Sequence, residues 1–490
     1  MSGNQPVSQL EQEVALVNYN TTTAEEIESD ILNPVVFSAD NSFCRFELEP
    51  KGFLSPDSAI SIGLTPNADV LRATFPAGVG VYSLIKRAVL KTSSGRVIND
   101  TDQLGEQMGL KAMWLSNDIN KQREQYSTGR ILNYNFLTDS KGNKATSYAL
   151  DNGKEYDSGT AGTGLHAHNF QVISNARTDL SPTFVVNLAE LFPFLKARNR
   201  IPLFMLGNDR LQIELFFSTT TDARVCLSSG DDAHTGKPFL INQNDVQLIA
   251  DHIFIPGGMD AWREAHKDED YGYTEMVVSK HQVTTTTATN NRRNIGGAGR
   301  QALRVYAGVV CDVTDKDDVV ANKVKGDLSI LNKYVSESNM RNEDIHVELT
   351  SNLFYNERFL FPQSITNSAR QYHNLKDASS KIVYCTRSTY ADEGGIDSGV
   401  AVNDALFPVN TAIYQYEGRV QREHLAGKQF YQGFRLNRGE RVGSKGIELI
   451  MNYADLRETA TKVGNYTQYS MIEVLKRAVI VNGQLEVMYT

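Results

Sequence analysis

The chain has 490 residues, of which 41% are hydrophobic and 22% are charged, and its formal net charge is −9. A chain of this length is too long to fold around one ordinary hydrophobic core and is long enough for two domains of above-average size. The negative net charge, together with the absence of any run of Lys or Arg, argues against a surface that neutralises nucleic-acid phosphates.

Four cysteines (Cys44, Cys226, Cys311 and Cys385) lie far apart in the sequence, and none forms a CxxC pair. We therefore predict neither a zinc site nor a disulfide framework, and we expect reduced thiols. The N-terminal residues lack the charged and apolar regions of a signal peptide, and no apolar run approaches the roughly 20 residues needed to cross a bilayer. These features predict a protein that is soluble inside the cell that makes it.

Residues 1–32 are polar and acidic and show no sustained periodicity. We predict an N-terminal arm that is either disordered or ordered against a neighbouring subunit. Strand patterns begin immediately afterwards. Cys44, Phe46 and Leu48 alternate with charged residues, which gives a strand one apolar and one polar face. The run 81–98 has a Ser-Gly turn between two β-prone segments, as in a hairpin.

A helix is predicted over residues 102–122, because apolar residues recur there at spacings of three and four and an Asp-Thr pair precedes them as capping candidates. Residues 138–165 are rich in Gly, Ser, Asp, Asn and Lys, which predicts a long surface loop. The first series of strands closes on an alternating segment at 211–217. The polar stretch at 221–244 is interpreted as an inter-domain linker.

The second half of the chain repeats the pattern of the first. It opens with a strand-like run at 246–255, continues through alternating segments such as 303–311, and ends in a hairpin at 477–489. The hairpin turn is Asn482-Gly483, the dipeptide that supplies the two positive-φ residues of a type I′ turn.

Each half shows roughly eight short strands, a helix or two and long polar loops. Antiparallel strands with one polar face build sandwiches, and eight strands in two sheets is the number of a jelly roll. We therefore predict an all-β protein of two tandem eight-stranded antiparallel jelly-roll sandwiches with a few short helices. Residues 33–220 are assigned to the first jelly roll and residues 245–490 to the second.

One motif suggests metal chemistry. His166 and His168 are separated by one residue, and two histidines on one strand face can bind a metal, as in jelly-roll enzymes of the cupin type. The cupin pattern has a glycine six residues before the first histidine and a glutamate four or five residues after the second. Thr160, Val172 and Ile173 occupy those positions here. Without the carboxylate a third ligand is missing, so a pair of loop histidines is the favoured interpretation.

The glycine-rich segment 296–300 lacks the features of a phosphate-binding loop. A P-loop needs Lys-Ser or Lys-Thr at the start of a helix, whereas Arg300 and Gln301 here lead into a strand. A loop tip is the favoured interpretation. No serine lies in a Gly-x-Ser-x-Gly elbow, and no cysteine has a local His or Asn partner. We predict no catalytic residue, no metal site and no cofactor, and we do not expect an enzyme.

Three segments resemble parts of the double jelly-roll major capsid proteins, a family shared by adenovirus-like, giant-virus, virophage and polinton-like DNA viruses. The hairpin at 84–98 with the helix after it is similar to a strand pair of the first roll. Residues 201–215 resemble the last strands of that roll, and residues 251–273 resemble the opening of the second. The Pro-Gly-Gly at 256–258 departs from the giant-virus pattern, which favours a polinton-like or virophage-type virus.

The resemblance implies a homotrimer in which six jelly rolls form a pseudo-hexagonal capsomer that tiles an icosahedral shell. It implies further contacts between capsomers and with minor capsid and penton proteins, no sequence-specific nucleic-acid binding, and a location in the virion capsid. Loops such as 138–165 and parts of 364–410 would decorate the outside, and trimer contacts would exceed roughly 2,000 Å². A minor capsid or spike protein of the same fold, a jelly-roll glycan-binding protein and a cupin-like metal-dependent protein are the alternatives.

Overall fold

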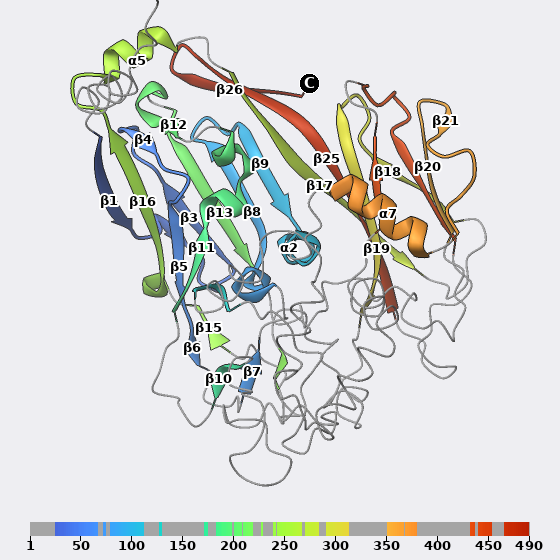
Figure 1. Ribbon diagram of the computed structural model, residues 1–490. Coiled ribbons are helices and arrows are strands. Elements are labelled where there is room, and N and C mark those ends of the chain that lie inside the picture. Colours follow the sequence, from blue (N-terminus) through green and yellow to red (C-terminus); the bar gives the residue numbers. More distant parts are fainter. Residues whose placement is uncertain are drawn as a thin grey trace, which may run out of the picture.

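The fold consists of two antiparallel β units that lie side by side (Figure 1). Among the described residues, no helix is long and apolar enough to cross a membrane. The computed structural model describes residues 25–66, 72–74, 79–111, 127–129, 171–174, 183–197, 200–207, 209–218, 227–228, 239–241, 243–266, 270–283, 291–312, 350–366, 368–379, 432–436, 440–452 and 465–489.

The first unit is a sandwich of two main sheets. One sheet has the order β11 (Thr183–Asn187), β5 (Ala59–Gly63), β16 (Val246–Phe254), β4 (Phe53–Leu54) and β12 (Ile201–Pro202), with β1 (Glu26–Leu32) paired along β16. The other has the order β2 (Val36–Phe37), β3 (Phe43–Glu47), β13 (Leu211–Phe217), β8 (Ile85–Thr92) and β9 (Val97–Asp102). Two smaller sheets lie at one end of this unit (Figure 1). One has the order β10 (Gln171–Ser174), β7 (Arg72–Thr74) and β14 (Leu227–Ser228), and the other pairs β15 (Phe239–Leu240) with β6 (Thr65–Pro66).

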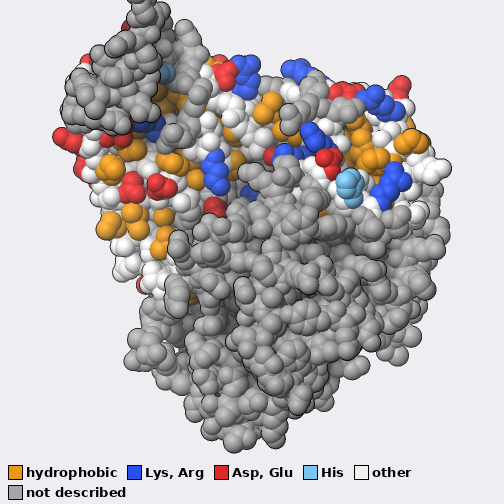
Figure 2. Space-filling view, in the orientation of Figure 1, with side chains coloured by type: hydrophobic (Ala, Val, Ile, Leu, Met, Phe, Trp, Pro, Cys, Tyr) orange, Lys and Arg blue, Asp and Glu red, His pale blue; other side chains and the backbone are white. Residues whose placement is uncertain are grey.

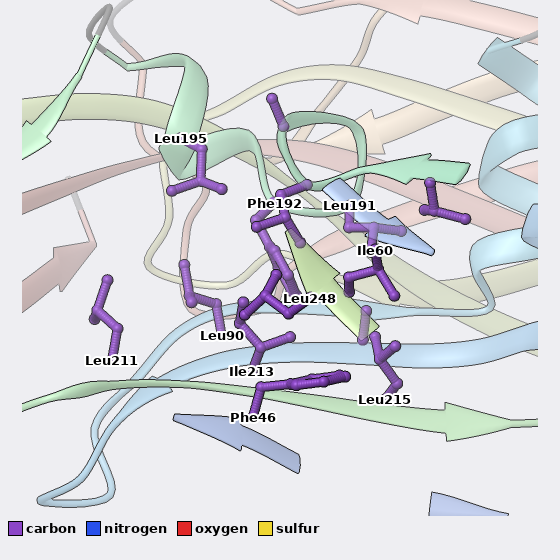
Figure 3. Close-up of a cluster of buried hydrophobic side chains, with 14 of the residues drawn as sticks. Phe46, Ile60, Leu90, Leu191, Phe192, Leu195, Leu211, Ile213, Leu215 and Leu248 are labelled. Carbon is purple, nitrogen blue, oxygen red and sulfur yellow. The ribbon is translucent and has the colours of Figure 1, made fainter. Parts of the chain in front are cut away.

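The core of this unit follows from the alternation of side chains along its strands. On β13, Leu211, Ile213, Leu215 and Phe217 are buried, whereas the residues between them are only half-buried. The apolar faces of both sheets therefore meet in one cluster, and each fully buried large side chain contributes about 1.5–3 kcal/mol. Figure 3 shows this cluster, which includes Phe46, Ile60, Leu90, Leu191, Phe192 and Leu248.

Short helical segments connect the strands of the first unit. Asn187 caps α4 with a side-chain oxygen that accepts a hydrogen bond of 2.8 Å from the Ala189 amide. The helix predicted at 102–122 begins as α2, and its residues after 111 lie outside the described part of the chain. The helical segments are η1 (Gly80–Leu84), α2 (Leu104–Lys111), α4 (Leu188–Leu191), η4 (Pro193–Lys196), η5 (Leu203–Met205), η6 (Gln243–Asp245) and α5 (Met259–Ala265).

The second unit also contains two sheets. The first has the order β17 (Asp270–Val283), β25 (Asn465–Val481), β19 (Ala302–Asp312) and β23 (Gln432–Arg435), with β26 (Gln484–Tyr489) paired to β25. The second has the order β18 (Arg292–Gly296), β24 (Ile447–Asn452), β20 (Thr350–Tyr355) and β21 (Arg358–Phe359). Helix α7 (Ser368–Ser379) packs on β23, where a Cβ added to Gly433 would lie 2.8 Å from the Leu375 Cα. Glycine is therefore what allows this close approach.

The all-β architecture of two tandem sandwiches agrees with the sequence prediction. The hairpin of β8 and β9 is present, and so is the C-terminal hairpin of β25 and β26. The turn of the C-terminal hairpin has φ values of 50° at Asn482 and 77° at Gly483, as a type I′ turn requires. Helix α7 occupies part of the predicted loop 364–410, and the loop 138–165 lies outside the described residues.

The pairing of β16 differs from the sequence interpretation, which placed residues 245–254 in the second roll. This strand hydrogen-bonds to β1, β4 and β5, so it completes a sheet of the first unit. The predicted linker 221–244 likewise contains β14 and β15, which pair with first-unit strands. Apolar alternation identifies a strand but not the sheet that it joins, and this is why the sequence did not reveal the pairing.

The predicted arm 1–32 contributes β1 to the same sheet. Its seven residues pair with β16 from Glu26 opposite Phe254 to Leu32 opposite Leu248. Beneath this pairing His252 is fully buried, with its Nδ1 3.1 Å from the Lys51 carbonyl and its Nε2 3.5 Å from the Asp30 carboxylate. Burial lowers the pKa of His252 and outweighs the opposing effects of the Lys51 carbonyl and the Asp30 charge.

The lowered pKa of His252 predicts a pH-dependent stability. The unfolded chain takes up a proton at the ordinary pKa of 6.5, whereas the folded His252 stays neutral to lower pH. The stability associated with the neutral ring is therefore fully present above about pH 6.5 and is lost as pH falls through the lowered folded value. Chemical denaturation between about pH 7.5 and 5 should show a steeper loss for the wild type than for His252→Gln. His373→Gln, at an exposed position on α7, is the control, and parallel curves for wild type and His252→Gln would contradict this account.

Candidate functional site: the seam between the two units

The two units share a long two-stranded ribbon. Strands β17 and β25 pair from Asp270 opposite Val479 to Val283 opposite Tyr466, so the ribbon is longer than a single sandwich face needs. Ile472 and Val474 of this ribbon lie in the core of the second unit. Its other end, with β26, lies in the core of the first unit through Tyr271, Tyr273, Ala478, Ile480 and Leu485. We call the contact between this end of the ribbon and β9 and η4 of the first unit the seam.

Aromatic side chains form the apolar part of the seam. Phe194 of η4 packs edge-on against both Tyr271 and Tyr273, at centroid distances of 6.0 and 5.3 Å. The Tyr273 hydroxyl donates a hydrogen bond of 2.8 Å to the Ile98 carbonyl. Burial raises the pKa of Tyr273 well above its ordinary value, so the hydroxyl keeps its proton and acts as a donor.

A buried ion pair forms the polar part of the seam. The Lys476 Nζ lies 2.6 Å from a Glu275 carboxylate oxygen, and the two side chains are only 2% and 5% exposed. Lys476 also donates to the Ile98 carbonyl at 3.1 Å, and Glu275 accepts from the Asp100 amide at 2.8 Å. Both charges therefore come from the ribbon, whereas these two additional partners are backbone groups of β9.

The neighbouring residue of β9 extends this network into the first unit. The Asn99 Nδ2 donates to the Glu275 carboxylate at 3.4 Å, and its Oδ1 accepts from the Phe194 amide at 3.0 Å. Burying two charges is unfavourable unless the pair is close and the remaining polar atoms are satisfied. These bonds are available only when β9 and the ribbon have one relative position, so the pair favours that position over others.

A cavity of about 180 Å³ lies beside the seam and is lined by both units. Arg304 and Glu473 line it as an ion pair of 3.0 Å, and Lys111, Lys196 and Glu190 add charges of both signs. A second cavity, of about 490 Å³, is lined by first-unit residues that include Tyr82 and Asn187. The charges of both signs around the first cavity are typical of a hydrated gap between packed elements, and not of a site selective for one ion.

The sequence-derived metal candidates, His166 and His168, lie outside the described residues. Within the described part of the chain, no group of three or more His, Cys, Asp or Glu residues could hold a metal ion. Cys44 is a free, fully buried thiol in the first core. Burial raises the pKa of Cys44 to about 12, which disfavours the thiolate that nucleophilic chemistry needs.

The glycine-rich segment 296–300 is a tight turn between β18 and β19. Its φ values are 98°, 82° and 71° at Gly296, Gly297 and Gly299, and glycine adopts these without strain. The Gly299 amide donates to the Val442 carbonyl at 2.9 Å, and the Arg300 amide donates to Gly297 at 3.2 Å. These two amides are thus bound within the protein, and not arranged around an anion.

The seam residues were not identified from the sequence, although a signal was present. Glu275 follows Tyr271 and Tyr273 at the spacing of one strand face, and Lys476 follows Val474 at the same spacing. Each charge therefore occupies a position in phase with apolar residues, where a buried side chain is expected. A single charged residue on an apolar face indicates a buried partner, but the sequence does not say which residue that partner is.

Comparison with known proteins shows the fold. No protein-family model matches the chain, and no curated protein matches it. Among solved structures, the chain is similar to PBCV-1 VP54, whose crystal structure was fitted into a cryo-EM reconstruction of the virophage Sputnik. The TM-score is 0.55 and the sequence identity is 11%, and the match covers 96% of this chain and 97% of VP54. The Faustovirus major capsid protein is similar with a TM-score of 0.52 and 10% identity, covering 97% of this chain and 92% of that protein.

These similarities extend over nearly the whole length of both chains, so the chain has the double jelly-roll fold. The resemblance to double jelly-roll major capsid proteins is thereby confirmed for the fold. Identities of 10% and 11% do not separate viral lineages, and the polinton-like or virophage lineage stays a prediction.

The buried pair can be tested by removing its cation. Lys476→Met leaves the Glu275 carboxylate buried without its partner, and we expect a loss of about 3–5 kcal/mol in the free energy of unfolding. Adding Glu275→Gln removes the unpaired carboxylate charge but keeps an oxygen that accepts from the Asp100 amide. The double variant should therefore recover much of the lost free energy of unfolding. Urea denaturation measures both values.

The neighbouring exposed ion pair supplies the control. Arg477→Met breaks the pair between Arg477 and Asp270 at the protein surface, and we expect a change of no more than about 1 kcal/mol. An equal loss for Lys476→Met and Arg477→Met would show that the buried pair has no special role in the seam.

Proposed function

We propose that this protein is a viral major capsid protein that forms a homotrimeric, pseudo-hexagonal capsomer and tiles an icosahedral shell. The observation that carries the proposal is the double jelly-roll fold, which covers 96% and 97% of this chain in the comparisons with PBCV-1 VP54 and the Faustovirus major capsid protein. The similarity thus extends over nearly the whole chain, as expected for a building block of this fold.

The geometry of the block supports this function physically. Two similar rolls side by side provide two corners of a hexagon, so three copies around a threefold axis provide six. A six-cornered block covers a flat facet with small gaps. Such tiling requires a constant angle between the rolls of every copy, and the buried pair and shared ribbon of the seam favour one angle.

The proposed role is structural and needs no catalytic residue, metal or cofactor. Its partners are other copies of the chain, first in the trimer and then between capsomers, together with minor capsid and penton proteins. The net charge of −9 suits a shell whose subunits do not themselves condense the genome. The proposed location is the virion capsid, after synthesis as a soluble chain in the host cell.

Light scattering after size-exclusion chromatography tests the trimer. We expect a particle with three times the mass of one chain, and electron microscopy of concentrated samples should show six-cornered particles that associate into sheets or shells. The variant His166→Ala with His168→Ala should assemble as the wild type does. A monomer at every concentration would contradict the proposal, and a monomer with stoichiometric bound metal would support the cupin-like alternative.

A further inference from the structure

One lateral end of the molecule presents an apolar sheet surface. Ile27 and Ile31 of β1 are 70% and 66% exposed, although isoleucine is usually buried. They are paired with Ile253 and Ile249 of β16, which are half-buried on the same side of the sheet. We call these four residues the β1 face. Figure 2 shows hydrophobic and acidic side chains together on this side of the molecule.

The surroundings of the β1 face are acidic. Residues 25–32 carry four carboxylates and no Lys or Arg. Lys51 pairs with Asp30 at 2.6 Å and with Glu28 at 3.4 Å, and Arg200 pairs with Glu25 at 2.7 Å. Two cations therefore face four carboxylates, and the edge keeps a negative charge.

Strands β20 and β21 lie at the opposite lateral end of the molecule (Figure 1). This end presents aromatic and basic side chains. Phe354 of β20 and Phe359 of β21 pack with their ring centroids 5.1 Å apart, and Phe359 is 50% exposed. The guanidinium of Arg292 lies 4.4 Å from the centroid of the Phe354 ring. We call Phe354, Phe359 and Arg292 the β21 face.

The surroundings of the β21 face are basic. Strands β18, β21 and β24, the turn between β20 and β21, and the segment 440–446 carry the cations Arg292, Arg293, Arg358, Arg441 and Lys445 against the carboxylates Glu357, Glu440 and Glu448. Arg358 pairs with Glu440, and Arg292 pairs with Glu448. Lys445 pairs with Glu357. The five cations outnumber the three carboxylates by two, so this end has the opposite charge to the β1 face.

Both faces include an edge strand of their sheets in the described part of the chain. Strand β1 pairs with β16, and β21 ends the order β18-β24-β20-β21. Exposed apolar surface at a sheet edge favours association with another chain, and opposite charges favour these two ends over two like ends. Since the two faces lie at opposite ends of one molecule, a contact between them joins copies head to tail. Head-to-tail contacts close into a ring when the rotation between copies permits it.

We propose that the β1 face of one copy docks on the β21 face of a second copy, and that this contact closes the capsomer. The inference rests on the proposed trimeric function and assigns its contact surface. The occupant of each face is thus another copy of this chain, held by Ile27 and Ile31 against Phe359 and by acidic residues against basic ones.

Charge substitutions in each face test the assignment. Ile27→Asp with Ile31→Asp removes the β1 face, and Phe359→Asp removes the β21 face. All three side chains are exposed, so folding should be retained, which circular dichroism and thermal unfolding check. We expect each variant to raise the concentration at which half of the trimer dissociates by at least about tenfold. Val97→Asp with Val481→Asp, also at exposed positions, is the matched control and should remain trimeric.

Mixing the two variants tests the head-to-tail geometry. The first variant retains an intact β21 face and the second an intact β1 face, so one productive contact remains between them. An equimolar mixture should form a heterodimer that neither variant forms alone, with twice the mass of one chain in light scattering. If each face docked on the same face of another copy, the mixture would give no such heterodimer.

The outcomes separate this assignment from the proposed function. A wild-type protein that is monomeric under all conditions overturns both. A wild-type trimer that persists unchanged in the Ile27→Asp/Ile31→Asp or the Phe359→Asp variant overturns the assigned contact and leaves the proposed function in place. Trimer loss in both variants together with the heterodimer supports both.

Discussion

The buried pair of Glu275 and Lys476 is the constraint on which the arrangement of the molecule depends. Both charges lie on the ribbon of β17 and β25, 2.6 Å apart. Backbone groups of β9 and the Asn99 side chain complete their hydrogen bonds. A pair of charges removed from water is tolerated only when every partner is in place. A tilt or slip of one roll against the other would leave a buried charge without partners. The pair therefore contributes specificity for one inter-roll geometry more than it contributes net stability.

The same ribbon joins the two hydrophobic cores. Ile472 and Val474 lie in the core of the second roll, and Tyr273, Ala478 and Ile480 lie in the core of the first. Because a single pair of hydrogen-bonded strands belongs to both cores, the two rolls form one block and not two domains on a linker. A subunit of this kind has a defined shape before it meets a neighbour. Its two lateral ends have opposite charges and are available for contacts between copies. Such contacts would lead from the fold of one subunit to the proposed shell.

Much of the fold could be predicted from the sequence because it depends on local patterns. Alternation of apolar residues identified most strands, and the Asn482-Gly483 turn identified the last hairpin. The partners of the strands could not be predicted in the same way. Strand β16 has the alternation expected in either roll, and only the folded chain shows it between β1 and β5. The acidic composition of residues 25–32 suggested an arm, but their pairing with β16 depends on tertiary contacts that composition does not contain. Glu275 and Lys476 disrupt the apolar pattern of their strands, and the sequence does not reveal that they meet.

The most direct test of the central claim is amide hydrogen exchange at Asp100, measured with residue resolution. The Asp100 amide donates to Glu275, which belongs to the other roll, so its protection reports the seam itself. A rigid seam predicts that Asp100 exchanges as slowly as core amides of β13 and β25, through global unfolding. Fast exchange at Asp100 while both cores stay protected would show that the rolls open against each other and would contradict a single rigid block.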